Sequence, residues 1–263
     1  MRTPTTTLLA LLFAASAVLS MPSASLAAPP TEPGLMLRPG NWDGDIGSYQ
    51  LPAALQPLPP ARWPNDGWQR LSIAGDQAQI AAVPAGPRQR PAFLAGIAAQ
   101  IVASQGGRIV DKTLAASGSP APDNVLYLRI PKQPLRSGAV ALYRFKNGTA
   151  TLTPMLEHRY QLLLGTQPFA FTVRNGLRSG KGSPYGEGAH YSVEYEGQVY
   201  DYMLPGFGWE SQVNAIADFD GDSKPDFLIT VTGNNSSHEY LLLSTLARPG
   251  LNPPSAALQA TGC

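Results

Sequence analysis

Apolar and polar residues alternate over many short stretches of this chain, with the two-residue period that is typical of β-strands. Residues 68–74 and 77–83 show it clearly, and Gly75-Asp76 between them predicts a hairpin with a two-residue turn. Further strands are predicted at 125–130, 139–146, 149–153, 160–164, 169–174, 191–196, 198–203, 213–217 and 226–232. Strands at this spacing predict an all-β fold of mostly antiparallel hairpins, arranged as a sandwich, a barrel or a blade-like sheet.

Two hairpins are marked by glycine. Asn147-Gly148 favours a tight turn that joins 139–146 to 149–153, because both residues tolerate positive φ. Gly197 separates two tyrosine-rich strands at 191–196 and 198–203.

Residues 92–104 have helical spacing and predict at most one short helix in the fold. The apolar residues that carry this spacing are Phe93, Leu94, Ile97, Ile101 and Val102. The alternative interpretation is a strand over 100–104 that pairs with 108–112 across Gly106-Gly107.

The first 28 residues have the pattern of a signal peptide. Arg2 is followed by an apolar run over 8–19 and by small residues up to Ala28, as a signal peptidase requires. The run is shorter than the roughly 20 apolar residues that span a bilayer, and no later stretch is long enough either. We therefore expect a product exported to the periplasm or the extracellular space, without a membrane span after cleavage.

Proline and cysteine suggest how the rest is organised. Residues 29–66 are rich in proline, which predicts an extended lead-in without a helix or a central strand. A β-rich domain is predicted over 67–250 and a C-terminal tail over 251–263. Cys263 is the only cysteine, so no internal disulfide can form.

The charge balance argues against nucleic acid as a partner. Lys and Arg number 19 against 18 Asp and Glu, and loss of Arg2 with the signal peptide would leave 18 of each. A neutral chain lacks the basic surface that provides most of the affinity for phosphate backbones.

Four aspartates lie within the nine residues of 218–226, between two apolar runs. Ca²⁺ prefers six to eight oxygen ligands, and a curled loop can turn alternate side chains toward one point. The predicted ligands are the carboxylates of Asp218, Asp220, Asp222 and Asp226 and the backbone carbonyl of Lys224. The loop differs from an EF-hand, because position twelve is Ile229 instead of Glu and the chain continues as a strand.

The sequence from Asp218 to Asp226, followed by Phe-Leu-Ile, resembles the calcium loop of FG-GAP and VCBS repeats of exported bacterial proteins and integrin-type propellers. The resemblance covers about 209–245 and includes a hairpin over 229–244. It implies a structural Ca²⁺ between two strands. Ser223 occupies the sixth position, where these repeats usually have Gly, and a left-handed non-Gly residue costs roughly 1–2 kcal/mol. A single copy does not predict a complete propeller.

We therefore expect an exported calcium-binding β protein in which the ion is structural and the strands present a recognition surface. Carbohydrate or a cell-surface protein is the expected partner, and the tyrosines of 191–203 are candidates for stacking on sugar rings. The leading interpretation is a protein without catalytic activity.

The alternative is a calcium-stabilised hydrolase of an extracellular polymer such as a polysaccharide. It would need two carboxylates roughly 5 to 9.5 Å apart in a cleft. The candidates are Glu187, Glu194, Glu196, Asp201 and Glu210. The simpler interpretation of Glu194 and Glu196 is a solvent-exposed face, because they alternate with Val193 and Tyr195.

Overall fold

The computed structural model describes residues 34–40, 42, 48–84, 90–104, 124–175, 188–206, 210–233 and 235–261. The predicted signal peptide, Glu187, Gly106-Gly107 and Cys263 lie outside these ranges. The described residues are mostly β-strand with one α-helix, which confirms the predicted all-β class. Within them, no helix is long and apolar enough to cross a membrane.

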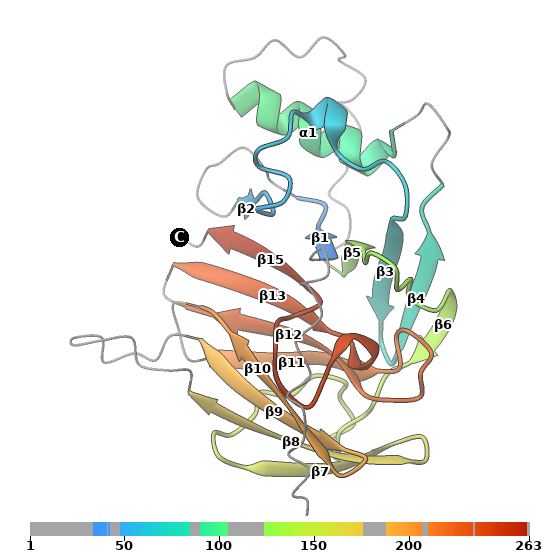
Figure 1. Cartoon of the computed structure of the whole chain (residues 1–263), viewed down its shortest axis with the longest axis vertical. Coiled ribbons are helices and arrows are strands. Elements are labelled where there is room, and N and C mark those ends of the chain that lie inside the picture. The colour runs from blue at the N-terminus through green and yellow to red at the C-terminus, as the bar shows by residue number, and fades with distance from the viewer. Residues whose placement is uncertain are drawn as a thin grey trace, which may run out of the picture. The chain divides into compact units, whose positions relative to one another are not determined.

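The strands form two sheets (Figure 1). The first contains β1 (Gly34–Leu37), β2 (Tyr49–Gln50), β3 (Gln69–Ala74), β4 (Gln77–Ala82), β5 (Val125–Arg129), β6 (Gly138–Ala141), β11 (Glu210–Ala217), β12 (Asp226–Thr232), β13 (Ser236–Leu242) and β15 (Ala256–Thr261). The second contains β7 (Arg159–Leu164), β8 (Gln167–Asn175), β9 (Ala189–Tyr195), β10 (Gln198–Leu204) and β14 (Gly250–Asn252). The first sheet has the order β11-β12-β13-β15-β1-β5-β3-β4-β6, with β2 beside β15, and the second has the order β14-β10-β9-β8-β7.

The segment around β6 nearly closes the first sheet. β6 pairs with β4, while residues that follow β6 bond to β11 at the far end of the sheet. The Tyr143 amide donates to the Ile216 carbonyl at 2.8 Å, and Leu152 exchanges two backbone hydrogen bonds with Val213. The free edge of β11 is thereby largely covered, as sheet edges in native proteins usually are.

Strands β11 to β13 contribute to two hydrophobic cores because both of their faces are buried. One face packs against the tyrosine-rich side of the second sheet, with Phe227 and Ile229 in the same cluster as Phe171 and Tyr191. The opposite face, which includes Leu228 and Leu241, belongs to the core inside the first sheet. Strands buried on both faces are nearly continuous in apolar residues, as β12 is.

The helix α1 (Ala92–Ser104) lies on the first sheet. The Phe93 ring stacks on Tyr127 of β5 with centroids 3.7 Å apart and meets Trp68 edge-on at 5.2 Å. The prediction of a helix over 92–104 is confirmed, and the alternative of a strand over 100–104 is wrong. Short 3-10 helices are formed by Pro60–Arg62 and Ser244–Leu246.

Most of the predicted hairpins are present. β3 and β4 pair around Gly75, β9 and β10 pair around Gly197, and β11 and β12 pair on either side of the acidic loop. The hairpin predicted around Asn147-Gly148 is present only as a turn: the Phe145 amide donates to the Thr149 carbonyl at 2.8 Å. Its flanking segments have other partners, because β6 pairs with β4 and Leu152 with Val213.

The structure corrects the predicted roles of both ends of the domain. β1 comes from the predicted lead-in of 29–66 but lies between β15 and β5. Its four residues fit between Pro33 and Pro39, so a short central strand is possible despite the high proline content. Residues 256–261, predicted as part of a tail, form β15 between β13 and β1. The alanine-rich sequence of β15 has a weak β propensity, and its pairing comes from its neighbours.

Candidate functional site

The acidic loop connects β11 to β12 and brings three of the predicted ligands together. Asp218, Asp220 and Asp222 each place a carboxylate oxygen within 4.8 Å of the others. All three side chains are partly buried. Carboxylate oxygens are the ligands that Ca²⁺ prefers, so the chemistry of this cluster fits a hard divalent cation.

Local hydrogen bonds hold these carboxylates in place. The Gly221 amide donates to Asp218 Oδ1 at 2.8 Å, and the Lys224 amide donates to Asp222 Oδ1 at 2.9 Å. Such side-chain to backbone bonds favour tight turns over strands. The turn also uses positive φ at Gly221 (85°) and at Ser223 (67°). Ser223 thus adopts a left-handed conformation, which is uncommon for a residue other than Gly.

Asp226 is completely buried at the start of β12 and accepts hydrogen bonds from two segments. The Phe219 amide donates to its Oδ2 at 2.7 Å, and the Ser244 amide donates to its Oδ1 at 2.8 Å. The carboxylate therefore joins the start of the loop to the segment after β13. Asp226 does not belong to the group formed by Asp218, Asp220 and Asp222.

The short helix Ser244–Leu246 adds two hydroxyl groups that were not predicted as part of this site. Ser244 Oγ lies 2.8 Å from Asp226 Oδ1 and 2.9 Å from Asp222 Oδ2, and its single proton can be donated to one of them at a time. Thr245 Oγ1 donates to Asp220 Oδ2. Ser-Thr pairs after a strand are common, so the sequence does not indicate this contact. The antiparallel pairing of β12 with β13 places Ser244 and Thr245 beside the acidic loop.

Crowding and burial change the acidity of the cluster. Burial, with the nearby charge of Asp222, raises the pKa of Asp220 to about 6. Burial, with the charge of Asp220, raises the pKa of Asp226 well above its ordinary value. Raised pKa values are expected where carboxylates are buried close to one another. A bound divalent ion would supply the positive charge that compensates them.

The side chain of Lys224 points from the loop toward the second sheet. Its Nζ lies 2.9 Å from Glu196 Oε2, in the turn between β9 and β10, and 5.6 Å from the centre of the Tyr195 ring. The pairing raises the pKa of Lys224. The predicted role of Lys224 concerned its backbone carbonyl, so this side-chain contact is an addition to it.

Two of the described acidic candidates for hydrolysis, Glu194 and Glu196, are held in separate ion pairs. Glu194 forms two hydrogen bonds with Arg159, at 3.1 and 2.7 Å, and this contact lowers the pKa of Glu194. Asp201 Oδ1 lies 3.1 Å from His190 Nε2 and accepts a hydrogen bond from Ser192 Oγ at 2.5 Å. Glu210 is exposed at the start of β11.

The tyrosines of β9 and β10 face the interior. Tyr191, Tyr195, Tyr200 and Tyr202 are all buried, and Tyr191 donates a hydrogen bond to Ser211 Oγ at 3.0 Å. They pack between the two sheets and cannot stack on an external sugar, so that expectation was wrong. The alternating residues His190, Ser192 and Glu194 are less buried, which agrees with the simpler interpretation of Glu194 as part of a solvent-exposed face.

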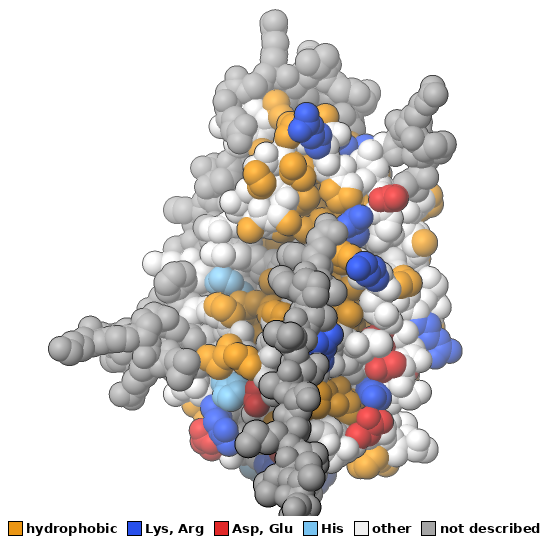
Figure 2. Space-filling view, in the orientation of Figure 1, with side chains coloured by type: hydrophobic (Ala, Val, Ile, Leu, Met, Phe, Trp, Pro, Cys, Tyr) orange, Lys and Arg blue, Asp and Glu red, His pale blue; other side chains and the backbone are white. Residues whose placement is uncertain are grey.

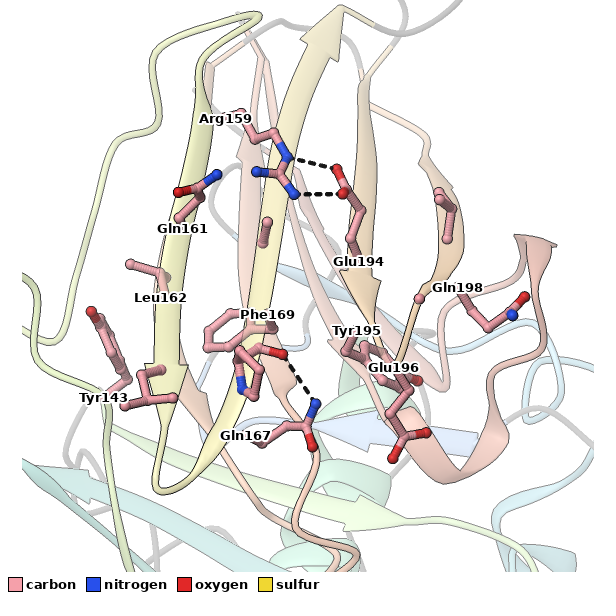
Figure 3. A pocket seen from close by; sticks show the side chains of 15 residues that line it. Tyr143, Arg159, Gln161, Leu162, Gln167, Phe169, Glu194, Tyr195, Glu196 and Gln198 are labelled. Carbon is pink, nitrogen blue, oxygen red and sulfur yellow. Dashed lines mark hydrogen bonds and ion pairs between the residues drawn. The ribbon is translucent and has the colours of Figure 1, made fainter.

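A groove of about 830 Å³ lies over the second sheet (Figure 3). Its walls come from β7, β8, β9, β10 and the turn between β9 and β10, with Tyr143 as the one contribution from elsewhere. Because β8 lies between β7 and β9, the ion pair of Arg159 and Glu194 crosses β8. Sequence reasoning missed this groove, since the register of three strands decides which side chains share it.

No family model, curated protein or solved structure matches this chain at a significant level. The resemblance of residues 209–245 to FG-GAP and VCBS repeats therefore stays a prediction.

Proposed function

We propose that this protein is an exported recognition module in which a structural Ca²⁺ stabilises the loop from Asp218 to Asp226. The ion would be held by the carboxylates of Asp218, Asp220 and Asp222, with the carbonyl of Lys224 and the carboxylate of Asp226 as the further predicted ligands. The observation that carries the proposal is the convergence of the first three carboxylates within 4.8 Å.

The contacts of the loop support a structural role for the ion. Asp226 and Asp222 bond to Ser244, which follows β13, and Lys224 bonds to Glu196 of the second sheet. A cation that neutralises the cluster would therefore stabilise the contacts of β11–β12 with two neighbouring segments. This connects ion binding to the stability of the fold instead of to a chemical step.

The geometry does not favour the hydrolase alternative. Within the described residues, Glu194, Glu196 and Asp201 each have a basic partner. A general acid requires a raised pKa, whereas Arg159 lowers that of Glu194.

Thermal unfolding in chelator and in about 1 mM Ca²⁺ tests the proposal. Selective binding to the folded state increases the free energy of unfolding and therefore raises Tm. The increase is about 2.7 kcal/mol when the ion concentration is a hundred times Kd. We expect a rise in the native protein and none in an Asp220→Ala, Asp222→Ala double variant. The same concentration of Mg²⁺ should have a smaller effect, because Mg²⁺ demands stricter octahedral geometry.

The matched control removes two exposed aspartates, Asp66→Ala and Asp76→Ala, which lie in turns that contact Arg129 and Arg144. This variant should keep the full calcium response. A native protein whose Tm is the same in chelator and in Ca²⁺ would rule out the proposed role of the ion.

A further inference from the structure

On the outer face of the second sheet, small side chains of β8 stand beside larger side chains of β7. Ala170 and Thr172 of β8 pair with Glu194 and Ser192 of β9, so small residues occupy the middle of this face. Larger residues stand beside them on β7, where Gln161 pairs with Ala170 and Leu163 with Pro168. The groove lined by Ala170 and by these residues of β7 is open to solvent and has a volume of about 830 Å³.

The charged groups of this face are already paired. Arg159 is bound to Glu194 on both carboxylate oxygens, and Glu196 at the mouth of the groove is bound to Lys224. A charged ligand would have to compete with these partners. On the face of the molecule drawn in Figure 2, basic and acidic side chains are likewise interspersed.

The remaining lining is neutral and mixed in polarity. Gln161, Gln167 and Gln198 supply amide donors and acceptors, as Figure 3 shows for their places around the groove. Leu163 and Val199 are 56% and 46% exposed and supply apolar surface to the same groove. A neutral ligand with both hydroxyl groups and C–H faces would match this mixed lining.

We propose that this groove binds a neutral oligosaccharide, with Gln161 and Gln198 as hydrogen-bonding residues and Leu163 and Val199 as apolar contacts. The inference rests on the recognition role proposed above and specifies its ligand class. An extended peptide is less favoured, because strand addition uses the backbone of a sheet edge, whereas this groove is lined by side chains.

Isothermal titration of the calcium-loaded protein with maltohexaose, cellohexaose, xylohexaose and mannohexaose tests the inference, with hexagalacturonate as the acidic counterpart. We expect saturable binding of at least one neutral sugar and at least about tenfold weaker binding of the acidic one. Replacing both amides, in a Gln161→Ala, Gln198→Ala variant, should weaken binding by about tenfold or more, since each hydrogen bond contributes modestly.

The matched control is Gln212→Ala, which removes an exposed glutamine from β11 outside the groove and should bind like the native protein. Both variants are exposed substitutions, and circular dichroism would verify that they fold. Binding of none of the four neutral sugars, equal binding of hexagalacturonate, or full binding by the double variant would overturn the inference. Binding of a pool of neutral hexapeptides without sugar binding would also overturn it.

The two proposals fail in different ways. If Ca²⁺ raises Tm but no sugar binds, the groove assignment fails and the ion keeps its structural role. If a sugar binds but Tm does not respond to Ca²⁺, the ion proposal fails and the groove assignment stands.

Discussion

Ser223 takes a left-handed backbone conformation within the acidic loop, with φ of 67°. A side chain in this region suffers a clash that glycine avoids, at a cost of roughly 1–2 kcal/mol. The loop nevertheless closes, because Asp222 and Lys224 on either side are fixed by hydrogen bonds to the aspartate side chains. The strain at one residue is thus offset by the contacts of its neighbours.

Replacing this residue, Ser223→Gly, should increase stability by up to about 1 kcal/mol, since the relief of strain exceeds the entropy that glycine adds to the unfolded chain. Urea unfolding would measure the change. As a control, Ser72→Gly in the regular strand β3 should decrease stability. A loss of stability in Ser223→Gly would contradict the strain argument.

His238 of β13 is a second residue whose surroundings set its behaviour. Its Nε2 is buried without a hydrogen-bond partner, its ring is parallel to that of Tyr240 at 6.1 Å, and burial lowers its pKa. The folded protein therefore binds fewer protons at this site than the unfolded chain does.

This difference predicts a pH dependence with a definite sign. The contribution of His238 is fully present above the unfolded pKa of about 6.5 and is lost as the pH falls through that value toward the folded pKa. His238→Gln should flatten the decline of stability as the pH falls below about 7, measured by urea unfolding. An unaltered slope in His238→Gln would count against the argument.

At the scale of elements, the loop depends on Asp226 as much as on the three clustered aspartates. Asp226 bonds to the Phe219 amide, before the turn, and to the Ser244 amide, beyond β13. Both donors lie in buried surroundings, where an unmade hydrogen bond costs about 1–3 kcal/mol. The carboxylate therefore joins the loop to the neighbouring hairpin, independently of any ion.

We expect Asp226→Ala to destabilise the protein by about 3 kcal/mol or more, because it leaves several buried donors without an acceptor. Asp226→Asn keeps one acceptor oxygen and should cost less. Urea unfolding in chelator would isolate this effect from ion binding. If Asp226→Ala lowered the free energy of unfolding no more than the exposed substitution Asp66→Ala does, the stabilising role of the Asp226 hydrogen bonds would be contradicted.

At the scale of the whole molecule, β11, β12 and β13 serve both hydrophobic cores. Leu241 lies in the core within the first sheet, whereas Val231 lies between the two sheets. Side chains on opposite faces of the same hairpins cannot lose their packing separately. The described part of the chain is therefore expected to unfold as one cooperative unit.

Calorimetry of Leu241→Ala and Val231→Ala tests this expectation. Deletions of this kind cost about 1–5 kcal/mol, depending on the cavity that remains. Each variant should lower Tm of the same single transition. Two separate transitions, with each substitution moving a different one, would show that the cores are independent.

Local sequence determined the elements whose information is contained in short stretches. The period of two predicted most of the strands, helical spacing predicted α1, and Gly75 and Gly197 marked their hairpins because tight turns need residues that tolerate positive φ. The spacing of Asp218, Asp220 and Asp222 likewise predicted their convergence, since a short loop confines alternate side chains to a small volume.

Tertiary structure alone decided the pairing of strands that are far apart in sequence. β15 lies between β13 and β1, and β6 pairs with β4 instead of continuing the turn at Asn147-Gly148. The contacts of Ser244 with the aspartates and of Arg159 with Glu194 follow from such pairings. Burial also reversed the expected role of the tyrosines, because the face that a strand buries depends on which sheet covers it.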